Sequence, residues 1–272
     1  MNFQYKRKIP IKETRKAIQN IVNNSKKTLY SSHINLSMSN KEKMLDEEKE
    51  PIYLIYQYFL PKTEKRLNEI QETLSRNVAN KHISKIYLLC ERHYTDEELG
   101  VSIPTDKIVQ EVIGRRMLFR DVFTFVEKYE LRGYIMTANA DIFFDDSISK
   151  LHYTDLDVSQ KIISLLRWEY CGEKKLSSCK LYGPSEKSQD TWIYHSNFNP
   201  KIPRNARSLF DTYFGQPGCD NRLLYAFWKG GYHINNDPMM FKTYHYHYNE
   251  PRDDYTLPRI PPPHIYVIPE IY

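Results

Sequence analysis

The sequence predicts an α/β fold with a largely parallel sheet. From Pro51 onward, short apolar and aromatic runs alternate with segments whose apolar residues recur at helical spacing. That alternation is typical of strands connected by helices that cover the sheet. The chain has 272 residues, of which 40% are hydrophobic and 14% are aromatic. This is enough apolar material for one full core, so we expect one folded domain with an added arm.

The first 50 residues differ from the rest in composition and charge. Residues 1–30 contain eight Lys or Arg and one acid, residues 31–50 contain three basic and five acidic residues, and residues 51–272 contain 28 of each. Polar sequence rich in Asn, Ser and Lys is typical of an arm or linker. We therefore predict a polar arm over residues 1–50, basic and then acidic, and a folded domain over residues 51–272.

The charge balance of the domain argues against nucleic acid as its partner. A duplex-binding surface needs an excess of basic residues to displace counterions from phosphate, and residues 51–272 have no such excess. A nucleic-acid interaction remains a third hypothesis that rests on the basic arm alone. The four cysteines form no C-x-x-C pair, and the chain has neither a long apolar run nor an apolar segment behind its basic N-terminus. These features predict a cytoplasmic protein without a transmembrane segment.

The expected elements follow one another along the domain. A strand at residues 52–60 precedes a helix at residues 63–78, in which Leu67, Ile70 and Leu74 recur at helical spacing. Further elements are then expected in this order: strands at 85–91 and 107–113, a helix at 115–129, and a buried strand at the start of 133–145. A turn at Pro217 and Gly218 leads into a helix with Leu223, Leu224 and Phe227 toward the core.

Polar residues end the buried strand that begins at residue 133. Asn139 and Asp141 follow its apolar part, and Asp145 and Asp146 come soon after. Ligands of open α/β sheets sit beyond the carboxyl ends of strands, so this position predicts a ligand site. An aspartate at such a position can hold a hard divalent cation against a diphosphate. Asp145 and Asp146 have a simpler explanation as caps of a helix that begins near residue 147.

Asn139, Ala140 and Asp141 resemble the D-x-D motif of GT-A nucleotide-sugar glycosyltransferases, with the first acid replaced by an amide. The resemblance implies a GT-A fold with a single mixed, mostly parallel sheet flanked by helices. It also implies that Asp141 is a ligand of Mn²⁺ or Mg²⁺, and that Asn139 contacts ribose or water. In this family a late histidine commonly joins the aspartate at the metal. His245 and His247 lie on one side of a predicted strand and are the candidates, His245 first.

Two further stretches add to the resemblance. Residues 188–195 contain an S-Q-D-x-W element, and residues 215–237 contain a G-C-D-N-R element. Together with A-D-I-F-F-D at residues 140–145, they resemble a set of predicted glycosyltransferases of large DNA viruses and microbes. The resemblance covers residues 51–272. If the chain is viral, it implies the host cytoplasm as the compartment.

The remaining candidate residues are assigned to the donor and the acceptor. Asp220 is the candidate general base for the acceptor hydroxyl, with a helix N-cap as the alternative, and Asp190 is its rival as base. Trp192 is a candidate for stacking on a sugar, with a place in the core as the alternative. Guanidinium groups match phosphate oxygens but also form ordinary salt bridges, which makes four arginines candidates for donor binding: Arg115, Arg116, Arg167 and Arg222.

These observations predict a metal-dependent glycosyltransferase that moves a sugar from a UDP- or GDP-sugar to a hydroxyl of a glycan or another acceptor. Asp220 as the base implies inversion of configuration, whereas in a retaining enzyme the same aspartate would only bind the acceptor. The alternative is a catalytically silent module that keeps the nucleotide-sugar fold, and Asn139 in place of an acid supports it. The sequence contains no G-x-x-x-x-G-K-[ST], G-x-G-x-x-G or G-x-S-x-G. P-loop, Rossmann and α/β-hydrolase functions are therefore not predicted.

Overall fold

The computed structural model describes residues 26–34, 49–101, 106–172, 175–201, 207–247 and 257–271. Seven of its strands form the central sheet: β2 (Ile52–Tyr56), β3 (Lys85–Cys90), β4 (Ile108–Val112), β5 (Tyr134–Ala138), β7 (Lys161–Leu165), β10 (Thr191–His195) and β11 (His233–Asn235). Their order is β11-β7-β10-β5-β2-β3-β4. Strand β10 is antiparallel to both neighbours, and the other neighbouring pairs are parallel. The predicted α/β fold with a mixed, mostly parallel sheet is confirmed.

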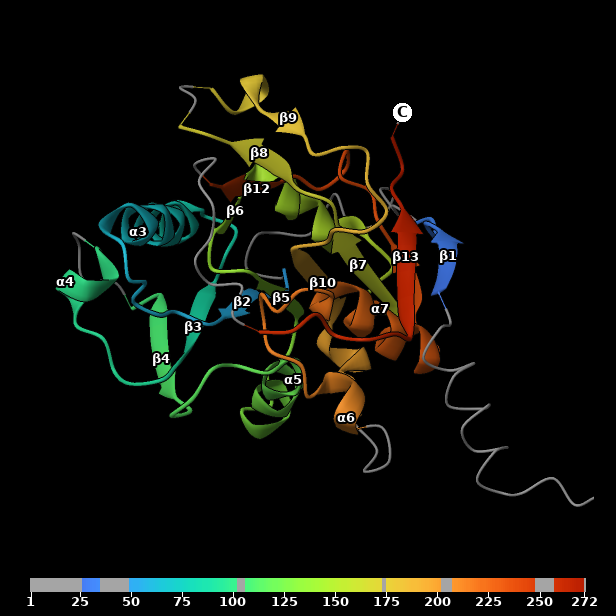
Figure 1. Ribbon diagram of the computed structural model, residues 1–272, viewed down its shortest axis with the longest axis horizontal. Coiled ribbons are helices and arrows are strands. Elements are labelled where there is room, and N and C mark those ends of the chain that lie inside the picture. The colour runs from blue at the N-terminus through green and yellow to red at the C-terminus, as the bar shows by residue number, and fades with distance from the viewer. Residues whose placement is uncertain are drawn as a thin grey trace, which may run out of the picture.

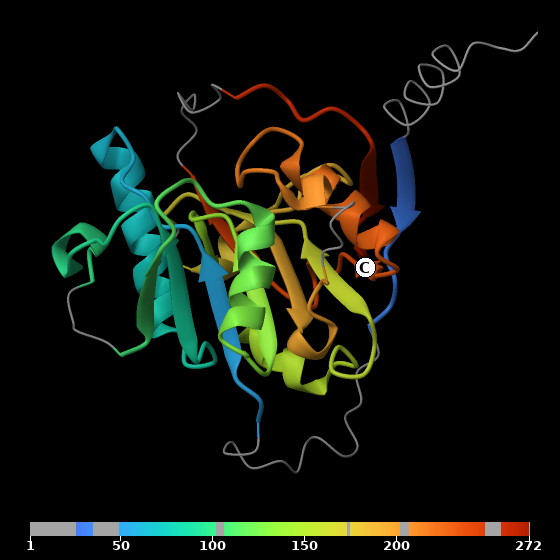
Figure 2. The same ribbon diagram turned by 90° about the horizontal axis from the view of Figure 1, so that it is seen from below.

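Helices cover both faces of this sheet (Figures 1 and 2). The α-helices are α3 (Glu64–Ala79), α4 (Asp96–Leu99), α5 (Phe119–Lys128), α6 (Arg207–Phe210) and α7 (Cys219–Lys229), and the 3-10 helices are η2 (Asp146–Tyr153), η3 (Leu176–Ser178) and η4 (Ser196–Phe198). Successive strand residues point to opposite faces. Leu54 accordingly packs in the cluster that contains Leu74 of α3, whereas Ile55 packs with Val122 of α5 and Leu223 of α7.

The helix expected at residues 115–129 begins later than predicted. Leu118 is the N-cap of α5 and has extended backbone angles, and the Asp121 carboxylate accepts a hydrogen bond from the Leu118 N–H at 2.8 Å. Arg115 donates two hydrogen bonds to the same carboxylate, both 2.7 Å long. These contacts hold the segment before Phe119 outside the helix. The prediction that Asp145 or Asp146 caps a helix is confirmed, because Asp145 is the N-cap of η2.

A four-stranded sheet lies beside the end of β5 and brings a distant part of the chain to it. Its strands are β6 (Ile142–Phe144), β12 (Thr243–Tyr246), β8 (Trp168–Tyr170) and β9 (Lys180–Leu181), in the order β6-β12-β8-β9. In the antiparallel pairing of β12 with β6, His245 lies opposite Ile142, the residue that follows Asp141. This pairing is the reason that the late histidine reaches the aspartate.

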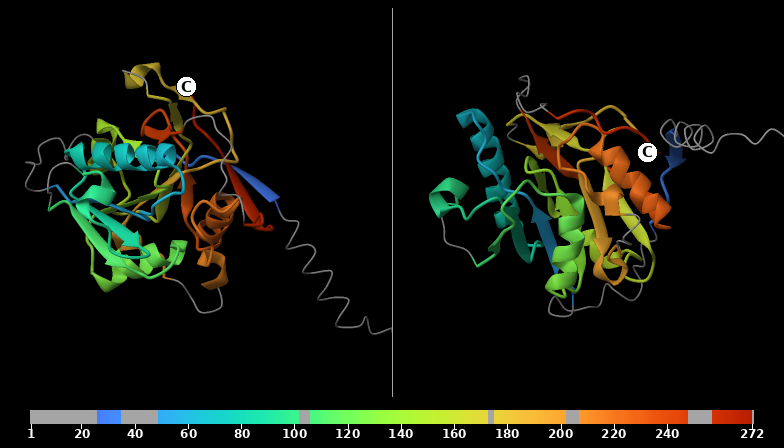
Figure 3. Two further views of the ribbon diagram at one scale, coloured as in Figure 1. Left: turned by 60° about the vertical axis from the view of Figure 1, so that its left-hand side comes forward. Right: turned by 60° about the horizontal axis from the view of Figure 1, so that its bottom comes forward.

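A two-stranded parallel sheet of β1 (Lys26–Tyr30) and β13 (His264–Ile268) lies at one edge of the molecule next to α7 (Figure 3). Ser32 donates a backbone hydrogen bond to Ile234 at 2.8 Å, and Ile34 is buried. Part of the predicted arm therefore contacts the domain. Residues 1–25 and 35–48 lie outside the described residues, so the division into a 1–50 arm and a 51–272 domain stays a prediction.

The helices and cysteines of the described residues bear on where the protein is located. Among these residues, no helix combines the length and apolar character that crossing a bilayer requires. Cys90, Cys179 and Cys219 are buried, and Cys171 is exposed. The cytoplasmic location stays a prediction.

Candidate functional site

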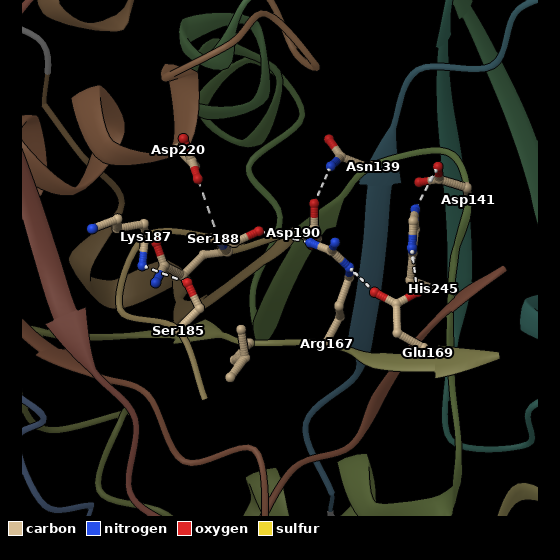
Figure 4. Close-up of polar contacts among 12 residues, drawn as sticks. Asn139, Asp141, Arg167, Glu169, Ser185, Lys187, Ser188, Asp190, Asp220 and His245 are labelled. Carbon is tan, nitrogen blue, oxygen red and sulfur yellow. Dashed lines mark hydrogen bonds and ion pairs between the residues drawn. The ribbon is translucent and has the colours of Figure 1, made fainter. Parts of the chain in front are cut away.

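Polar side chains converge at one edge of the central sheet, where β5 and β7 end and β10 begins. Asn139 and Asp141 follow β5, Arg167 follows β7, and Asp190 precedes β10. Backbone hydrogen bonds fix this convergence, from Asn139 to Asp190 at 3.1 Å and from Asp190 to Leu165 at 3.2 Å. Figure 4 shows the resulting row of side chains, with Asp141 at one end and Asp220 at the other.

Asp141 and His245 form the buried end of this row. The Nε2 atom of His245 lies 3.0 Å from Oδ2 of Asp141, and the two side chains are 5% and 2% exposed. The backbone is tied at the same point, because the Tyr246 N–H donates to the Asp141 carbonyl at 2.9 Å. The His247 ring lies 5.4 Å from that of His245, on the same side as predicted, but its Nδ1 faces Glu69 at 3.8 Å.

The row continues from His245 to Asn139 through alternating charges (Figure 4). His245 Nδ1 lies 3.2 Å from Glu169 Oε2, and Arg167 donates through Nε to Glu169 Oε1 at 2.8 Å. Arg167 also donates through Nη1 to Asp190 Oδ2 at 2.7 Å. The amide of Asn139 donates to the other Asp190 oxygen at 2.7 Å. Asn139 is thus an orienting group for Asp190 in this structure.

Arg66 is a site residue that the sequence did not reveal. It lies in the first turn of α3 and donates through Nη2 to Asp141 Oδ2 and through Nη1 to Glu69 Oε2, each at 2.6 Å. Its side chain is 17% exposed and that of Glu69 is 3% exposed. The same Asp141 oxygen therefore faces both a guanidinium and an imidazole.

The buried charges shift the pKa values of this group. Burial opposes a charge on His245, but Asp141 and Glu169 outweigh burial and raise its pKa. Burial alone would raise the pKa of Glu169, yet hydrogen bonds and charges from His245 and Arg167 lower it to about 2. The row therefore favours a positively charged His245 between two carboxylates.

The donor atoms of Asp141 and His245 fit a divalent cation that has further ligands from elsewhere. Their 3.0 Å separation is roughly that of neighbouring ligands on an octahedral ion with bonds of about 2.1 Å. In the described part of the chain, no three His, Cys, Asp or Glu side chains form a group that could hold a metal by themselves. Diphosphate oxygens and water would supply the other positions, as is usual for Mg²⁺. A cation would also have to displace Arg66 from Asp141 and the proton from His245.

Asp220 lies at the other end of the row, in the first turn of α7. Gly218 is the N-cap of this helix, so the N-cap alternative for Asp220 is wrong. Its Oδ2 accepts a long 3.4 Å hydrogen bond from the Gln189 N–H, and its Oδ1 accepts from the Asn221 amide at 2.9 Å. Burial raises the pKa of Asp220 to about 7, and the charge of Asp190 adds to the rise.

Trp192 belongs to the core and has no face available to a sugar. It is 0% exposed and packs edge-on against Phe119 and Phe214, with ring centroids 5.0 and 5.9 Å away. The predicted stacking of Trp192 on a sugar is wrong, because β10 points this side chain at the helices and not beyond the strand end. The core alternative is the correct one.

The other predicted arginines lie outside this row. Arg115 is exposed and pairs with Asp121, and Arg116 donates to the carbonyl of Phe214 at 2.5 Å. Arg222 lies on α7, and its Nε is buried without a hydrogen-bond partner among the described residues. Only Arg167 lies in the row, so donor contacts by the other three stay predictions.

Comparisons with known proteins give distant structural likenesses. No protein-family model matches the chain, and no curated protein sequence matches it. A nucleotide-diphospho-sugar transferase structure from Desulfovibrio desulfuricans aligns with a TM-score of 0.44 and 9% identity over 69% of this chain and 79% of that one. A mannosyltransferase from Pyrobaculum calidifontis, solved with GDP-Man and Mn²⁺, aligns with a TM-score of 0.47 and 10% identity over 82% of this chain and 61% of that one. The glycosyltransferase GlyE of Streptococcus pneumoniae aligns with a TM-score of 0.40 and 12% identity over 69% of this chain and 45% of that one.

Proposed function

We propose that this chain is a GT-A-type glycosyltransferase that moves a sugar from a UDP- or GDP-sugar to an acceptor hydroxyl. The observation that supports it is the row of side chains at the strand ends. The row begins at a buried aspartate–histidine pair, Asp141 and His245, and ends at Asp220, a carboxylate with a raised pKa. A metal-binding pair and a separate base are the two parts that such a transfer requires.

The donor would bind at the Asp141 end. Mn²⁺ or Mg²⁺, held by Asp141 and His245, would supply positive charge to the leaving diphosphate. Arg167 is 14% exposed and is fixed by Glu169 and Asp190, so its guanidinium has a defined orientation without the ligand. Such a fixed cation can stabilise the charge of the departing diphosphate.

The acceptor would bind at the Asp220 end, with Asp220 as the general base. A base works best when its pKa lies near the operating pH, and burial brings the pKa of Asp220 to about 7. Asp190 is the weaker candidate because the Arg167 guanidinium pairs with one of its oxygens, whereas among the described residues Asp220 accepts hydrogen bonds only from neutral groups, the Gln189 N–H and the Asn221 amide. Direct attack by an acceptor activated in this way inverts the configuration of the sugar.

Calorimetry with UDP and GDP, with and without Mn²⁺, tests the donor site. We expect nucleotide binding that depends on Mn²⁺, and we expect Asp141→Asn to weaken it at least about tenfold. The matched control is Asp146→Asn, which removes the same charge from a side chain that is 77% exposed. No nucleotide binding at all would overturn the proposal, as would equal losses in the two variants.

Product formation separates the enzyme from a silent module. The silent alternative has one supporting feature, the amide of Asn139 where the D-x-D motif has an acid. The protein is incubated with UDP- or GDP-sugars and Mn²⁺, and the release of free UDP or GDP is measured. This release decides between the enzyme and the silent module. Metal-dependent nucleotide binding without any turnover of sugar would favour the module.

A further inference from the structure

Four basic residues gather at the N-terminal end of α7, outside the row described above: Lys26, Arg222, Arg259 and His264. The segment after residue 257 crosses this helix end. Its Ile260 N–H donates to the Pro217 carbonyl at 2.9 Å, and the Gln216 amide donates to Pro258, also at 2.9 Å. These contacts attach the segment that contains Arg259 and His264 to the turn that precedes α7.

Gly218 allows this segment to approach the helix end closely. It is the N-cap of α7, with φ at 82°, and no side chain caps the helix. A Cβ at Gly218 would lie 3.3 Å from the Ile260 carbonyl oxygen, 3.5 Å from Cε1 of His264 and 3.6 Å from Cγ of Arg259. The ring edge of His264 therefore faces the positive end of the helix dipole.

His264 is buried, and no side chain among the described residues hydrogen-bonds to it. It is 3% exposed, and both ring nitrogens lack a side-chain partner there. In the parallel pairing of β1 with β13, Lys26 lies directly beside it. Burial lowers the pKa of His264, and the charges of Arg222, Arg259 and Lys26 lower it further, while a hydrogen bond to the Ile260 backbone raises it.

Arg222 completes the cluster from the helix itself. It is one turn after Gly218, and residues four apart lie on the same helix face. Its Nε is buried without a partner among the described residues, and burial lowers its pKa. Buried polar groups are nearly always hydrogen-bonded, and basic groups held together repel one another. An oxyanion would both hydrogen-bond the buried polar groups and reduce the repulsion among the basic ones, since guanidinium, imidazole and helix N-termini all bind such groups.

We propose that Arg222, Arg259, His264 and Lys26 bind an oxyanion of the acceptor, a phosphate or a carboxylate, and so select acidic acceptors. The inference rests on the proposed function, because it assigns the cluster to the acceptor of that reaction. Asp220, the proposed base, lies in the first turn of the same helix. The metal pair is at the opposite end of the row (Figure 4), so the donor diphosphate would lie away from the cluster.

Histidine ring signals in NMR spectra provide a test at the site itself. The His264 signal, assigned by its loss in His264→Gln, is followed during titration with inorganic phosphate and then with glucose 6-phosphate, with glucose as the neutral control. We expect saturable shifts with both phosphates and none with glucose. We expect Arg222→Gln to weaken the affinity about tenfold, which is the effect of losing one charge-assisted hydrogen bond. Lys229→Gln, at the exposed far end of α7, should change it less than about twofold.

Several outcomes would overturn the inference. They are the absence of any shift in the parent protein, and equal effects of Arg222→Gln and Lys229→Gln. If Arg222→Gln does not fold, the exposed Arg259→Gln takes its place with the same expectation. Saturating UDP or GDP with Mn²⁺ should leave phosphate binding intact, and competition would assign the cluster to the donor instead. If neither nucleotide binds, the proposed function fails, whereas the phosphate titration still decides whether the oxyanion site exists.

Discussion

The imidazole of His245 lies 3.0 Å from the carboxylate of Asp141, although 104 positions separate the two residues. The contact follows from the pairing of β12 with β6, in which His245 lies opposite Ile142. Both side chains are at most 5% exposed, so the pair is formed and desolvated before any ligand arrives. Preformed geometry of this kind lowers the cost of binding a cation and its diphosphate.

His245, in β12, and His247, just after it, should differ in their effect on metal binding. We expect His245→Gln to lower Mn²⁺-dependent nucleotide affinity at least about tenfold, because it removes a nitrogen beside Asp141. His247→Gln should have an effect below about threefold, since His247 faces Glu69 at 3.8 Å. Calorimetry on both variants measures this difference. A larger loss in His247→Gln would make His247 the ligand.

Arg66 should compete with the metal for Asp141. Its Nη2 lies 2.6 Å from Oδ2, the oxygen that faces His245. Arg66→Gln removes this positive charge, so we expect Mn²⁺ affinity without nucleotide to rise several-fold, measured by electron paramagnetic resonance of free Mn²⁺. Lys62→Gln, which removes an exposed charge just before α3, is the control and should have little effect. A weaker affinity in Arg66→Gln would mean that Arg66 holds Asp141 in place for the metal.

Activity should rise with pH through the ionisation of Asp220. Its pKa is raised from the usual 3.8 to about 7, first by burial, with a further contribution from Asp190. The carboxylate form is the base, so kcat/KM should increase with pH and level off above about 7. Asp190→Asn removes the neighbouring negative charge and should move the midpoint to lower pH. A pH profile unchanged by Asp220→Glu and by Asp190→Asn would exclude Asp220 as the base.

The same ionisation should affect the free energy of unfolding. A carboxyl whose pKa is raised by folding binds more protons in the folded state than in the unfolded state between pH 3.8 and about 7. Its contribution to stability is therefore complete below the unfolded pKa and is lost as pH rises through the folded pKa. Asp220→Asn should gain stability relative to the parent protein on going from pH 5 to pH 8, measured by urea unfolding. An equal difference at both pH values would contradict the raised pKa.

Local pattern was sufficient to predict much of the fold and part of the site. Helical spacing located α3 and the buried face of α7, and the change from apolar to polar residues located Asp141 at a strand end. The i, i+2 spacing of His245 and His247 correctly predicted that they share one side. These features depend on neighbours in the sequence, which is why the sequence alone was informative.

The site residues that the sequence did not reveal reach the site through long-range contacts. Arg66 and Asp141 are 75 positions apart, and Glu169 and His245 are 76 apart. Nothing near Arg66 distinguishes it from a solvated residue in a first helical turn. Glu169 did offer a signal, because it lies two positions after Arg167 and such residues share a face in an extended chain. Trp192 was misassigned because a strand end gives no indication of which sheet face a ring occupies.

Trp192 should affect stability and not acceptor recognition. It is 0% exposed between Phe119 and Phe214, so Trp192→Ala should lower the free energy of unfolding by about 3–5 kcal/mol. Trp192→Phe should lower it less and should leave nucleotide binding within about twofold of the parent protein. Tyr182→Ala is the comparison, because that ring is 40% exposed and lies 4.0 Å from the Arg167 guanidinium. Its removal should cost under about 1 kcal/mol. Chemical denaturation measures all three, and a stable Trp192→Ala that loses acceptor or donor affinity would restore the sugar-stacking role.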